Sequence, residues 1–293
     1  MTRQRRAGWA FVSPALIAVA VCFVVPVIGA LALSFTDFDI YGVADRHAVR
    51  FIGLDNYRRL LTTPLFWSAL ANTAVFVVVG APLSIAVSLG SALVLNGRLV
   101  RARGAFRTAL FAPVVTTVVA VAVIWRYIFH TRYGFLNYVL GWFGIDAIDW
   151  LGDPHWSMPA MIVFAVWKNF GYNMIIFVAG LQNIPGELYE AARIDGAGRV
   201  ARFRFITLPA LAPTMLLVTL LTMVGYFQLF AEPYVMTRGG PAQSTTSVLY
   251  FMFEEGFKWW NLGYASAVAF VLFAIMLAGT LIQLAVARRW SRA

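Results

Sequence analysis

The chain has 293 residues, of which 61% are hydrophobic and only 12% are charged. Soluble domains carry roughly 25% charged residues, so this composition excludes an ordinary soluble domain and predicts a chain that lies in a bilayer. The formal net charge is +10, but the basic residues gather in short clusters beside apolar runs, which is typical of a membrane protein rather than a nucleic-acid-binding one.

Apolar runs long enough to cross a bilayer recur along the chain. A spanning helix needs about 20 mostly apolar residues. We therefore predict that 1–293 is a single all-α integral membrane domain, with both termini on the same side. Its six predicted transmembrane helices cover about 9–34, 70–95, 105–128, 157–181, 208–232 and 264–287.

The basic residues of the loops predict the orientation. The two terminal segments and the loops at 96–107 and 182–207 carry 14 Lys and Arg, whereas the three opposite loops carry 7. Lys and Arg are enriched in cytoplasmic loops, so we expect a multi-pass protein of the cell membrane with cytoplasmic N- and C-termini. The segment 187–207 is then cytoplasmic as well.

The fourth apolar run contains the densest set of polar residues within a predicted span, W-K-N-F-G-Y-N. Asn169 and Asn173 are four residues apart and share one helical face, with Tyr172 beside them. Two interpretations stay open for these side chains: they line a translocation path, or they form hydrogen bonds between helices. Lys168 is interpreted as a structural residue or as one that extends toward the membrane surface.

The fifth run carries Tyr226 and Gln228 near its outer end. An aromatic ring there could stack on a sugar in a translocation path, but aromatic packing between helices explains it as well. Gly239, Gly240 and Pro241 follow in the next outer loop, where this combination predicts a turn.

A charged segment, EAARIDGAGRVARFRFITLPALAP, occupies residues 190–213 between two apolar runs. Its pattern predicts a short helix over about 187–194 that stops at Asp195-Gly196, since glycine tolerates the left-handed backbone that ends a helix. A second short helix is predicted over 199–207. Pro209 then falls in the first turn of the fifth span, where a missing N–H costs little.

The spacing E-A-A, then D-G-A, then I-T-L-P resembles the EAA loop of the membrane subunits of ABC importers. The longer form, ending F-R-F-I-T-L-P, resembles the carbohydrate-uptake branch of those permeases, as do F-I-G-L-D-N-Y at 51–57 and R-T-A-L-F-A-P at 107–113. This resemblance implies a type I ABC importer permease fold with a short cytoplasmic coupling helix. It implies that the outer loop at 239–241 faces a substrate-binding protein. It also implies contact with an ATPase through Glu190, Ala191, Ala192, Asp195, Gly196 and Pro209.

No phosphate-binding loop of the form G-x-x-x-x-G-K-[ST] occurs, because neither lysine of the chain, Lys168 or Lys258, stands in that setting. We therefore expect no catalytic residue, cofactor or metal in this chain, with ATP and Mg²⁺ bound by partner subunits. The partners implied by the resemblance are a second permease subunit in a heterodimer, two ABC ATPase subunits and an extracytoplasmic sugar-binding protein; no nucleic acid is expected.

The predicted function is ATP-driven import of a mono- or oligosaccharide across the cytoplasmic membrane. One alternative is import of glycerol 3-phosphate or another polyol derivative by the same machinery. An anionic substrate would need buried cationic groups, and Lys168 and Arg126 are the candidates. A more distant alternative is a secondary transporter, which would need several charged groups inside the membrane, where Lys168 alone lies deep in a span.

Overall fold

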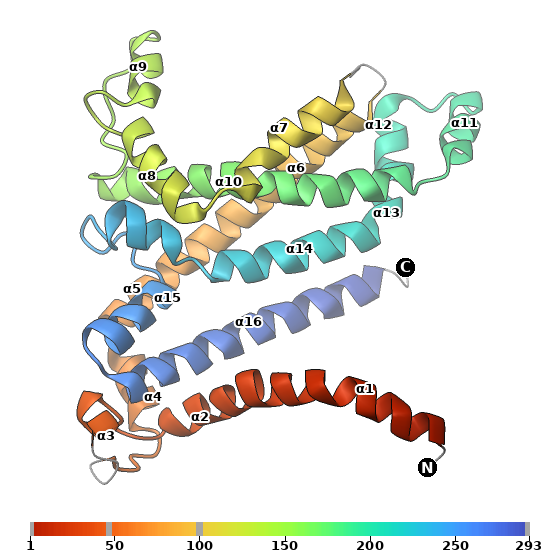
Figure 1. The fold of residues 1–293 in the computed structure, drawn as a ribbon. Helices are drawn as coiled ribbons and strands as arrows, with labels where there is room; N and C mark the ends of the chain where they lie inside the picture. The colour runs from red at the N-terminus through yellow and green to blue at the C-terminus, as the bar shows by residue number, and fades with distance from the viewer. Residues whose placement is uncertain (1–2, 45–48, 98–101, 291–293) are drawn as a thin grey trace. The chain divides into compact units, whose positions relative to one another are not determined.

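The computed structural model describes residues 3–44, 49–97 and 102–290, and these ranges are largely helical (Figure 1). An isolated antiparallel bridge joins Thr36 to Phe51. The extreme ends of the chain, predicted to be cytoplasmic, lie outside the described residues. So do Arg98 and Arg101, two of the basic residues on which the predicted orientation rests.

The chain divides into two compact units, one formed by 1–67 with 251–275 and the other by 68–250 with 276–293. Short π-helical turns (η) interrupt or join several α-helices. The main elements are α1 (Arg3–Val19), η1 (Ala20–Val24), α2 (Val25–Leu33), α3 (Ile40–Ala44), α4 (Asp55–Thr62), α5 (Pro64–Val75), η3 (Phe76–Gly80), α6 (Ala81–Asn96), α7 (Arg103–Val115), α8 (Val118–Ile128), α9 (Phe135–Gly141), α10 (Pro154–Gln182), α11 (Gly186–Ile194), α12 (Arg199–Arg202), η4 (Phe203–Thr207), α13 (Leu208–Ala210), α14 (Ala212–Phe227), η5 (Pro233–Thr237), α15 (Val248–Phe253), η6 (Glu254–Lys258) and α16 (Leu262–Trp290).

Four helices of the described chain are long and apolar enough to cross a membrane. They cover Gly8–Leu33, Pro64–Asn96, Pro154–Gln182 and Leu262–Ala287. Two further pairs pass the same test only when their members are joined: α7 with α8, bent by 99°, and the segment Arg199–Ala210 with α14, bent by 68°. The count reaches six when each bent pair is one span.

In the first unit, the end of α2 is tied to α4 by polar contacts. The Asn56 side chain donates hydrogen bonds to the carbonyl oxygens of Ser34 and Thr36, at 2.9 and 2.8 Å. The hydroxyl groups of Ser34 and Tyr57 lie 2.7 Å apart. The bond to the Ser34 carbonyl pairs a group at the C-terminal end of α2, where a helix leaves carbonyl groups without partners. Asn56 and Tyr57 belong to the F-I-G-L-D-N-Y stretch, whose polar residues thus have a structural role.

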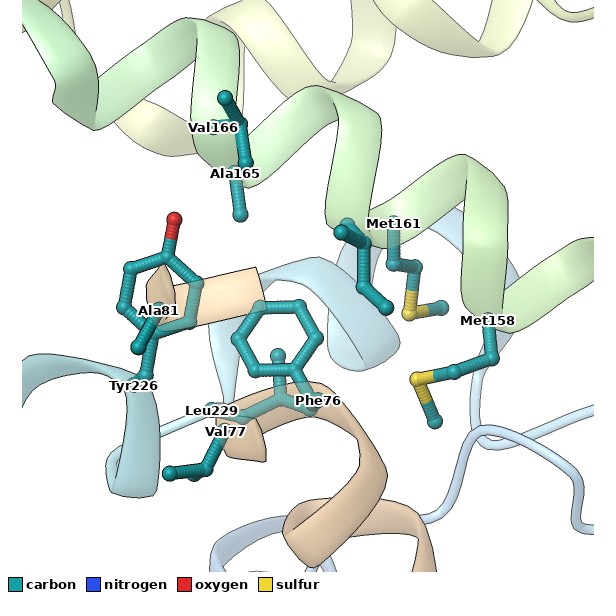
Figure 2. Packing of buried hydrophobic residues seen from close by; sticks show 10 residues of the cluster. Phe76, Val77, Ala81, Met158, Met161, Ala165, Val166, Tyr226 and Leu229 are labelled. Carbon is teal, nitrogen blue, oxygen red and sulfur yellow. The ribbon is translucent and has the colours of Figure 1, made fainter. Parts of the chain in front are cut away.

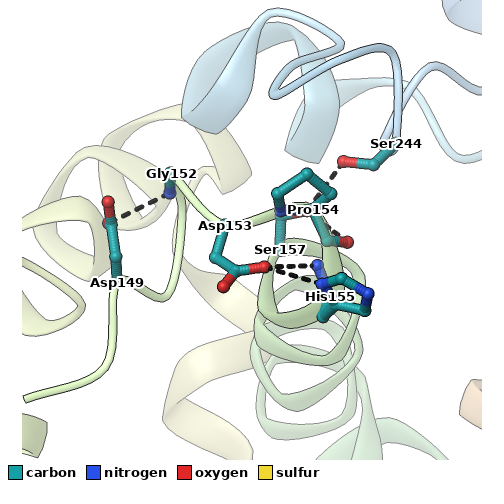
Figure 3. Close-up of polar contacts among 7 residues, drawn as sticks. All are labelled: Asp149, Gly152, Asp153, Pro154, His155, Ser157 and Ser244. Carbon is teal, nitrogen blue, oxygen red and sulfur yellow. Dashed lines mark hydrogen bonds and ion pairs between the residues drawn. The ribbon is translucent and has the colours of Figure 1, made fainter.

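In the second unit, α10 begins with a strong helix-start signal (Figure 3). The Asp153 carboxylate accepts a hydrogen bond of 2.8 Å from the backbone N–H of His155, and Pro154 occupies the first helical position. Both are favourable because the first N–H groups of a helix have no partner within it. The same hydrogen bond lowers the pKa of the Asp153 carboxyl group below its usual value of 3.8.

The core of the second unit forms where α10 packs against α6, α7 and α14 (Figure 1). In the most apolar stretch of α10, 67% of the residues are buried, although the sequence of this stretch is as apolar as that of an ordinary membrane span. Figure 2 shows one packed cluster, in which side chains from α10 meet those from η3, α6 and the end of α14. The cluster consists of Phe76, Val77, Ala81, Met158, Met161, Ile162, Ala165, Val166, Tyr226 and Leu229.

Close approach of α10 to α7 depends on Gly171. A Cβ atom at this position would lie 2.3 Å from the carbonyl oxygen of Leu110, so only glycine fits without moving backbone. Nearby, the Lys168 amino group donates a hydrogen bond of 3.1 Å to the carbonyl oxygen of Val114, just before the break between α7 and α8. The predicted continuous helix 105–128 is divided at this break, where Thr117 has extended backbone.

The predicted fifth span, 208–232, is also divided. The chain bends at Leu211, and α14 ends at Phe227, before the predicted boundary. Beyond this end, the Ser247 hydroxyl donates a hydrogen bond to the Leu229 carbonyl oxygen. A side chain remote in sequence thus takes the place of the N–H that a continued helix would have supplied.

Candidate functional site

The first candidate site is built around α11 and the turn that follows it. The N–H of Ala197 donates to the carbonyl of Ala192 at 2.8 Å, and the N–H of Gly196 donates to that of Arg193 at 3.2 Å. This pair of bonds is the Schellman motif, which ends a helix and requires a left-handed residue directly after the C-cap, here Asp195. Gly196 supplies it, with a φ of +76°. The sequence therefore ends α11 where the D-G pair stands.

One face of α11 packs against the rest of the loop, and the other face is exposed. The hydroxyl groups of Tyr189 and Thr207 lie 2.9 Å apart and join α11 to η4. Glu190 and Ala191 are exposed, and Ala192 is half-buried. The described chain gives Glu190 no ion pair, so its carboxylate and the small residue beside it form a free surface.

The return from α11 to the fifth span is one bent helical path. Asp195 is exposed at the end of α11, and α12, η4 and α13 then run on without interruption from Arg199 to Ala210. Pro209 stands at the start of α13 and Pro213 at the start of α14. At Pro213 a missing N–H costs little, because the first turn of a helix has no acceptor for it. Pro209 lies inside the continuous helical run, directly after the π-helical turn η4, and so does not stand in a first turn.

The polar residues of α10 do not act as one set. Asn173 is 4% exposed, and its side chain donates a hydrogen bond of 2.8 Å to the Thr222 hydroxyl on α14. Asn169 and Tyr172 are exposed, and Asn169 donates to the carbonyl of Ala165 in its own helix. Asn173 is therefore engaged in contact between helices, whereas Asn169 and Tyr172 have surface free for other contacts.

Tyr226 differs from both groups, because it is buried with an unsatisfied hydroxyl group. Its ring stacks on Phe76 at 5.0 Å between centroids, and its oxygen points toward α10 (Figure 2). The hydroxyl of Ser84 is also buried without a hydrogen-bond partner among the described residues. The side chains of Ser84 and Asn169 and the Glu232 carboxylate lie near the Tyr226 hydroxyl. Together they form a small polar site in an apolar core.

Gln228 does not join this site. It follows the last residue of α14 and is exposed, with its N–H bonded to the Gly225 carbonyl at 3.2 Å. Ser84 and Thr222 belong to the polar set but were not among the predicted residues. A signal was present for Ser84, because Ser84 and Ser88 stand four apart in an otherwise apolar helix and share one face.

The loop after α14, predicted to lie on the outer side, is held by contacts within itself. Gly239 is buried with a φ of +80°, and Cβ at this position would lie 2.7 Å from the Thr246 hydroxyl. The Gly240–Pro241 peptide bond is cis, and the Thr245 hydroxyl donates to the Gly240 carbonyl at 2.6 Å. The exposed tip lies just beyond these three residues, at 242–243. Gly239 therefore shapes the loop rather than forming its surface.

The chemistry available at these places is hydrogen bonding and docking. Within the described ranges, no cluster of three His, Cys, Asp or Glu side chains could hold a metal ion. The free groups are hydroxyl and amide groups in the core and a carboxylate on α11. Such groups can bind hydroxylated molecules and a protein partner, respectively.

Comparison with known proteins shows which family this chain resembles. Residues 19–292 match the family described as "Binding-protein-dependent transport system inner membrane component". The chain is 36% identical to the lactose transport system permease protein LacF of Rhizobium radiobacter, over 96% of this chain and 94% of that protein. It is 33% identical to the trehalose/maltose transport system permease protein MalF of Thermococcus litoralis, over 98% and 95% of the two chains.

A solved structure of a bacterial ABC transporter involved in import of the acidic polysaccharide alginate has the same fold. It superposes with a TM-score of 0.81 at 23% sequence identity, over 98% of this chain and 96% of that chain. The expected all-α permease architecture is thus confirmed, and the motif resemblance extends over nearly the whole sequence. The chain belongs to the family of binding-protein-dependent transport system inner membrane components.

Proposed function

We propose that this protein is the membrane-spanning permease subunit of an ATP-driven ABC importer that carries a sugar across the cytoplasmic membrane. The observation that carries the proposal is likeness along almost the full chain to permeases named for lactose, for trehalose and maltose, and for arabinooligosaccharides. The chain itself does no chemistry in this scheme. ATP and Mg²⁺ are held by two partner ATPase subunits, and a second, different permease subunit completes the pathway.

The coupling contact in this proposal is the exposed side of α11. Motion of an ATPase reaches the membrane helices only through a rigid connection, and the Schellman turn at Gly196 gives the loop a fixed shape. Glu190 is free to accept hydrogen bonds, and Ala191 and Ala192 allow a partner surface to approach closely. Asp195, Gly196 and Pro209 direct the chain back into the bent fifth span. Positive charges beside this loop favour the cytoplasmic orientation of both it and the termini.

The substrate path in this proposal runs beside Asn169, Tyr172 and Tyr226. Buried hydroxyl groups without partners are costly in a folded protein, and a sugar hydroxyl would satisfy those of Tyr226 and Ser84. Asn173 and Gln228 stay in the candidate set with smaller parts, since Asn173 is bonded to Thr222 and Gln228 lies at a helix end. The loop at 239–241 is assigned to the side that meets the sugar-binding protein.

A neutral sugar fits these groups better than glycerol 3-phosphate. A phosphate passing through the core would need a free cation, but Lys168 is buried and its amino group donates to a backbone carbonyl. Lys168 is also the one Lys, Arg, Asp or Glu residue of α10, so this helix offers an ion-coupled secondary transporter few charged groups.

The test is transport by the complete importer, with both permease subunits, reconstituted in vesicles. Labelled sugars are first screened for binding to the cognate binding protein, and the best is offered for uptake with and without ATP. We expect accumulation that requires both ATP and the binding protein and that glycerol 3-phosphate does not compete. Uptake driven by an ion gradient without ATP would contradict the proposal, and competition by glycerol 3-phosphate would transfer it to that substrate.

A further inference from the structure

A pocket of about 380 Å³ lies at the cytoplasmic end of the second unit, apart from the polar site near Tyr226. Two arginines, Arg199 and Arg202, line it together with the polar residues Asn96, Tyr189 and Thr207 and the apolar residues Leu93, Leu181 and Phe203. No acidic residue lines it. The size is within the range of roughly 300–1,000 Å³ that small-molecule sites occupy.

The positive charge of this pocket is not balanced within the described chain. Neither Arg199 nor Arg202 forms an ion pair there, and the Nε atom of Arg202 is buried without a hydrogen-bond acceptor. Burying a donor of a charged group without an acceptor is costly, so an anion bound by the half-buried Arg202 would relieve that cost, and the exposed Arg199 would add further donors. The guanidinium group is suited to a phosphate, because its N–H groups match two phosphate oxygens at once.

The position of the pocket relative to the ends of the spans indicates which kind of phosphate it would bind. Asn96 ends the span Pro64–Asn96, Leu181 is the second-last residue of the span Pro154–Gln182, and Thr207 stands just before α13. The pocket therefore lies at the level where membrane spans end. Its lining is amphipathic, with arginines on one part and Leu93, Leu181 and Phe203 on the other. A soluble phosphate has no use for the apolar part, whereas a phospholipid would use both.

We propose that this pocket binds the headgroup phosphate of an anionic phospholipid from the cytoplasmic leaflet. That leaflet attracts basic groups near the membrane surface in any case, and basic pockets between membrane helices are known to bind anionic headgroups. The choice of leaflet rests on the orientation proposed above. Tyr189 of α11 and Thr207 of η4 both line the pocket, and their hydroxyl groups lie 2.9 Å apart, so an occupant would contact the coupling loop directly.

The experiment measures lipid binding directly on the purified importer complex after removal of native lipid. Phosphatidylglycerol and phosphatidylcholine are titrated separately, and bound lipid is counted by native mass spectrometry. We expect a preferred phosphatidylglycerol site, weakened roughly fivefold for each arginine replaced in Arg199→Gln and Arg202→Gln. Arg202→Lys, which keeps the charge, should retain most of the binding.

The matched control is Arg204→Gln, which removes the same charge two residues away. Arg204 is exposed, does not line the pocket and lies over the ring of Phe205, so its loss should leave the preferred site intact. Equal weakening by Arg204→Gln, or equal affinity for the two lipids, would overturn the proposal. Displacement of bound lipid by low concentrations of inorganic phosphate would assign the pocket to a soluble phosphate instead.

Two outcomes separate this proposal from the proposed function. Unchanged phosphatidylglycerol binding in Arg199→Gln and Arg202→Gln, combined with loss of the ATPase subunits, would assign both arginines to protein contact and overturn the lipid site. Preferred lipid binding in a complex that transports no sugar would support the lipid site and leave the transport proposal as the one that failed.

Discussion

The packed core around α10 and the loop formed by α11 and α12 differ in how their polar groups are paired. Those of the core are mostly hydrogen-bonded within the protein, whereas those of the loop are exposed. In the core, Asn173 is bonded to Thr222, and the Ser88 hydroxyl donates to the Phe170 carbonyl at 3.0 Å. On the loop, Glu190 and Asp195 are exposed and form no ion pair among the described residues. Apolar side chains follow the same division, since Ile194 at the end of α11 is 87% exposed.

This difference shows which parts of the chain are complete by themselves. The core satisfies most of its hydrogen bonds internally and so determines how the spans pack. The loop leaves charged and apolar groups open, as a surface does when its partner is another protein. Changes in the core should therefore alter stability first, whereas changes in the loop should alter coupling first. Each experiment below tests one side of that division.

The largest effect is expected from Gly171→Ala. The added Cβ would meet the Leu110 carbonyl oxygen at 2.3 Å, and because the neighbour is backbone, α7 and α10 must separate. We expect a loss of about 1–3 kcal/mol in the free energy of unfolding, the usual range for overpacking. Thermal unfolding in detergent measures it.

The matched control for this change is Gly90→Ala, in the apolar helix α6. No atom lies within 4 Å of a Cβ placed there, so its stability should be unchanged or slightly raised. Equal loss in the two variants would show that the contact between α7 and α10 does not set the stability of the core.

Gly196→Val tests the loop. The position has a φ of +76° and open space around it, so the cost lies in the backbone, about 1–2 kcal/mol for a side chain in the left-handed region. We expect ATP-dependent uptake to fall roughly five- to thirtyfold while membrane insertion and thermal stability change little. Uptake and unfolding are measured on the same preparation.

Two companion variants sharpen that result. Gly196→Asn should keep much of the transport, since asparagine tolerates the left-handed region. Gly198→Val places the same side chain two residues away at a φ of −67° and with open space, so it should be nearly neutral. Transport that is unaltered in Gly196→Val would remove the coupling role from this turn.

Tyr226→Phe tests whether the core also has an open group. Only the buried, unpartnered hydroxyl is lost, so thermal stability should hold or rise. If that hydroxyl contacts the sugar, transport should fall about fivefold, the value of one hydrogen bond of roughly 1 kcal/mol. Tyr127→Phe, at an exposed position of α8, is the control. A fall in stability with transport intact would make Tyr226 a packing residue only.

The smallest effect is expected at the N-terminal end of α10. Because the folded-state pKa of Asp153 lies below its unfolded value of 3.8, the carboxylate stabilises the fold above that pH. The contribution is lost as the pH falls through the folded-state pKa. Asp153→Asn keeps a capping side chain but does not titrate, so the two proteins should converge in thermal stability as the pH falls below 3.8 and through the folded-state pKa. A constant difference across the acid range would show that the cap does not depend on charge.

The sequence predicted well those features that short stretches determine. Continuous apolar runs indicate membrane spans wherever they fall, and Asp195-Gly196 indicates a helix end, because a left-handed residue at that place favours glycine. The break after α7 was not predictable in this way. It lies at Thr116-Thr117, with no glycine, and the carbonyl of Val114 is held by Lys168 from another helix.

The candidate path shows the same limit. Spacing placed Asn169 and Asn173 on one face of α10, but spacing does not say which helix lies opposite. The rotation of α14 brings Thr222 to Asn173, and Ser84 lies near Tyr226 because α6 crosses there. Both are results of packing between distant segments. Assigning a function to individual polar residues within a span therefore requires the structure, even where the span itself can be predicted from the sequence.

The contacts of α10 with the main chain of α7 have a consequence for how related sequences diverge. Gly171 approaches the carbonyl of Leu110, and Lys168 bonds to that of Val114. Both contacts are made to main-chain atoms of α7, which are the same for every amino acid. Substitutions on α7 can accumulate without disturbing either contact, provided its backbone keeps its course. Related chains should then vary freely at Leu110 and Val114, which contribute only main-chain atoms, and little at Gly171 and Lys168.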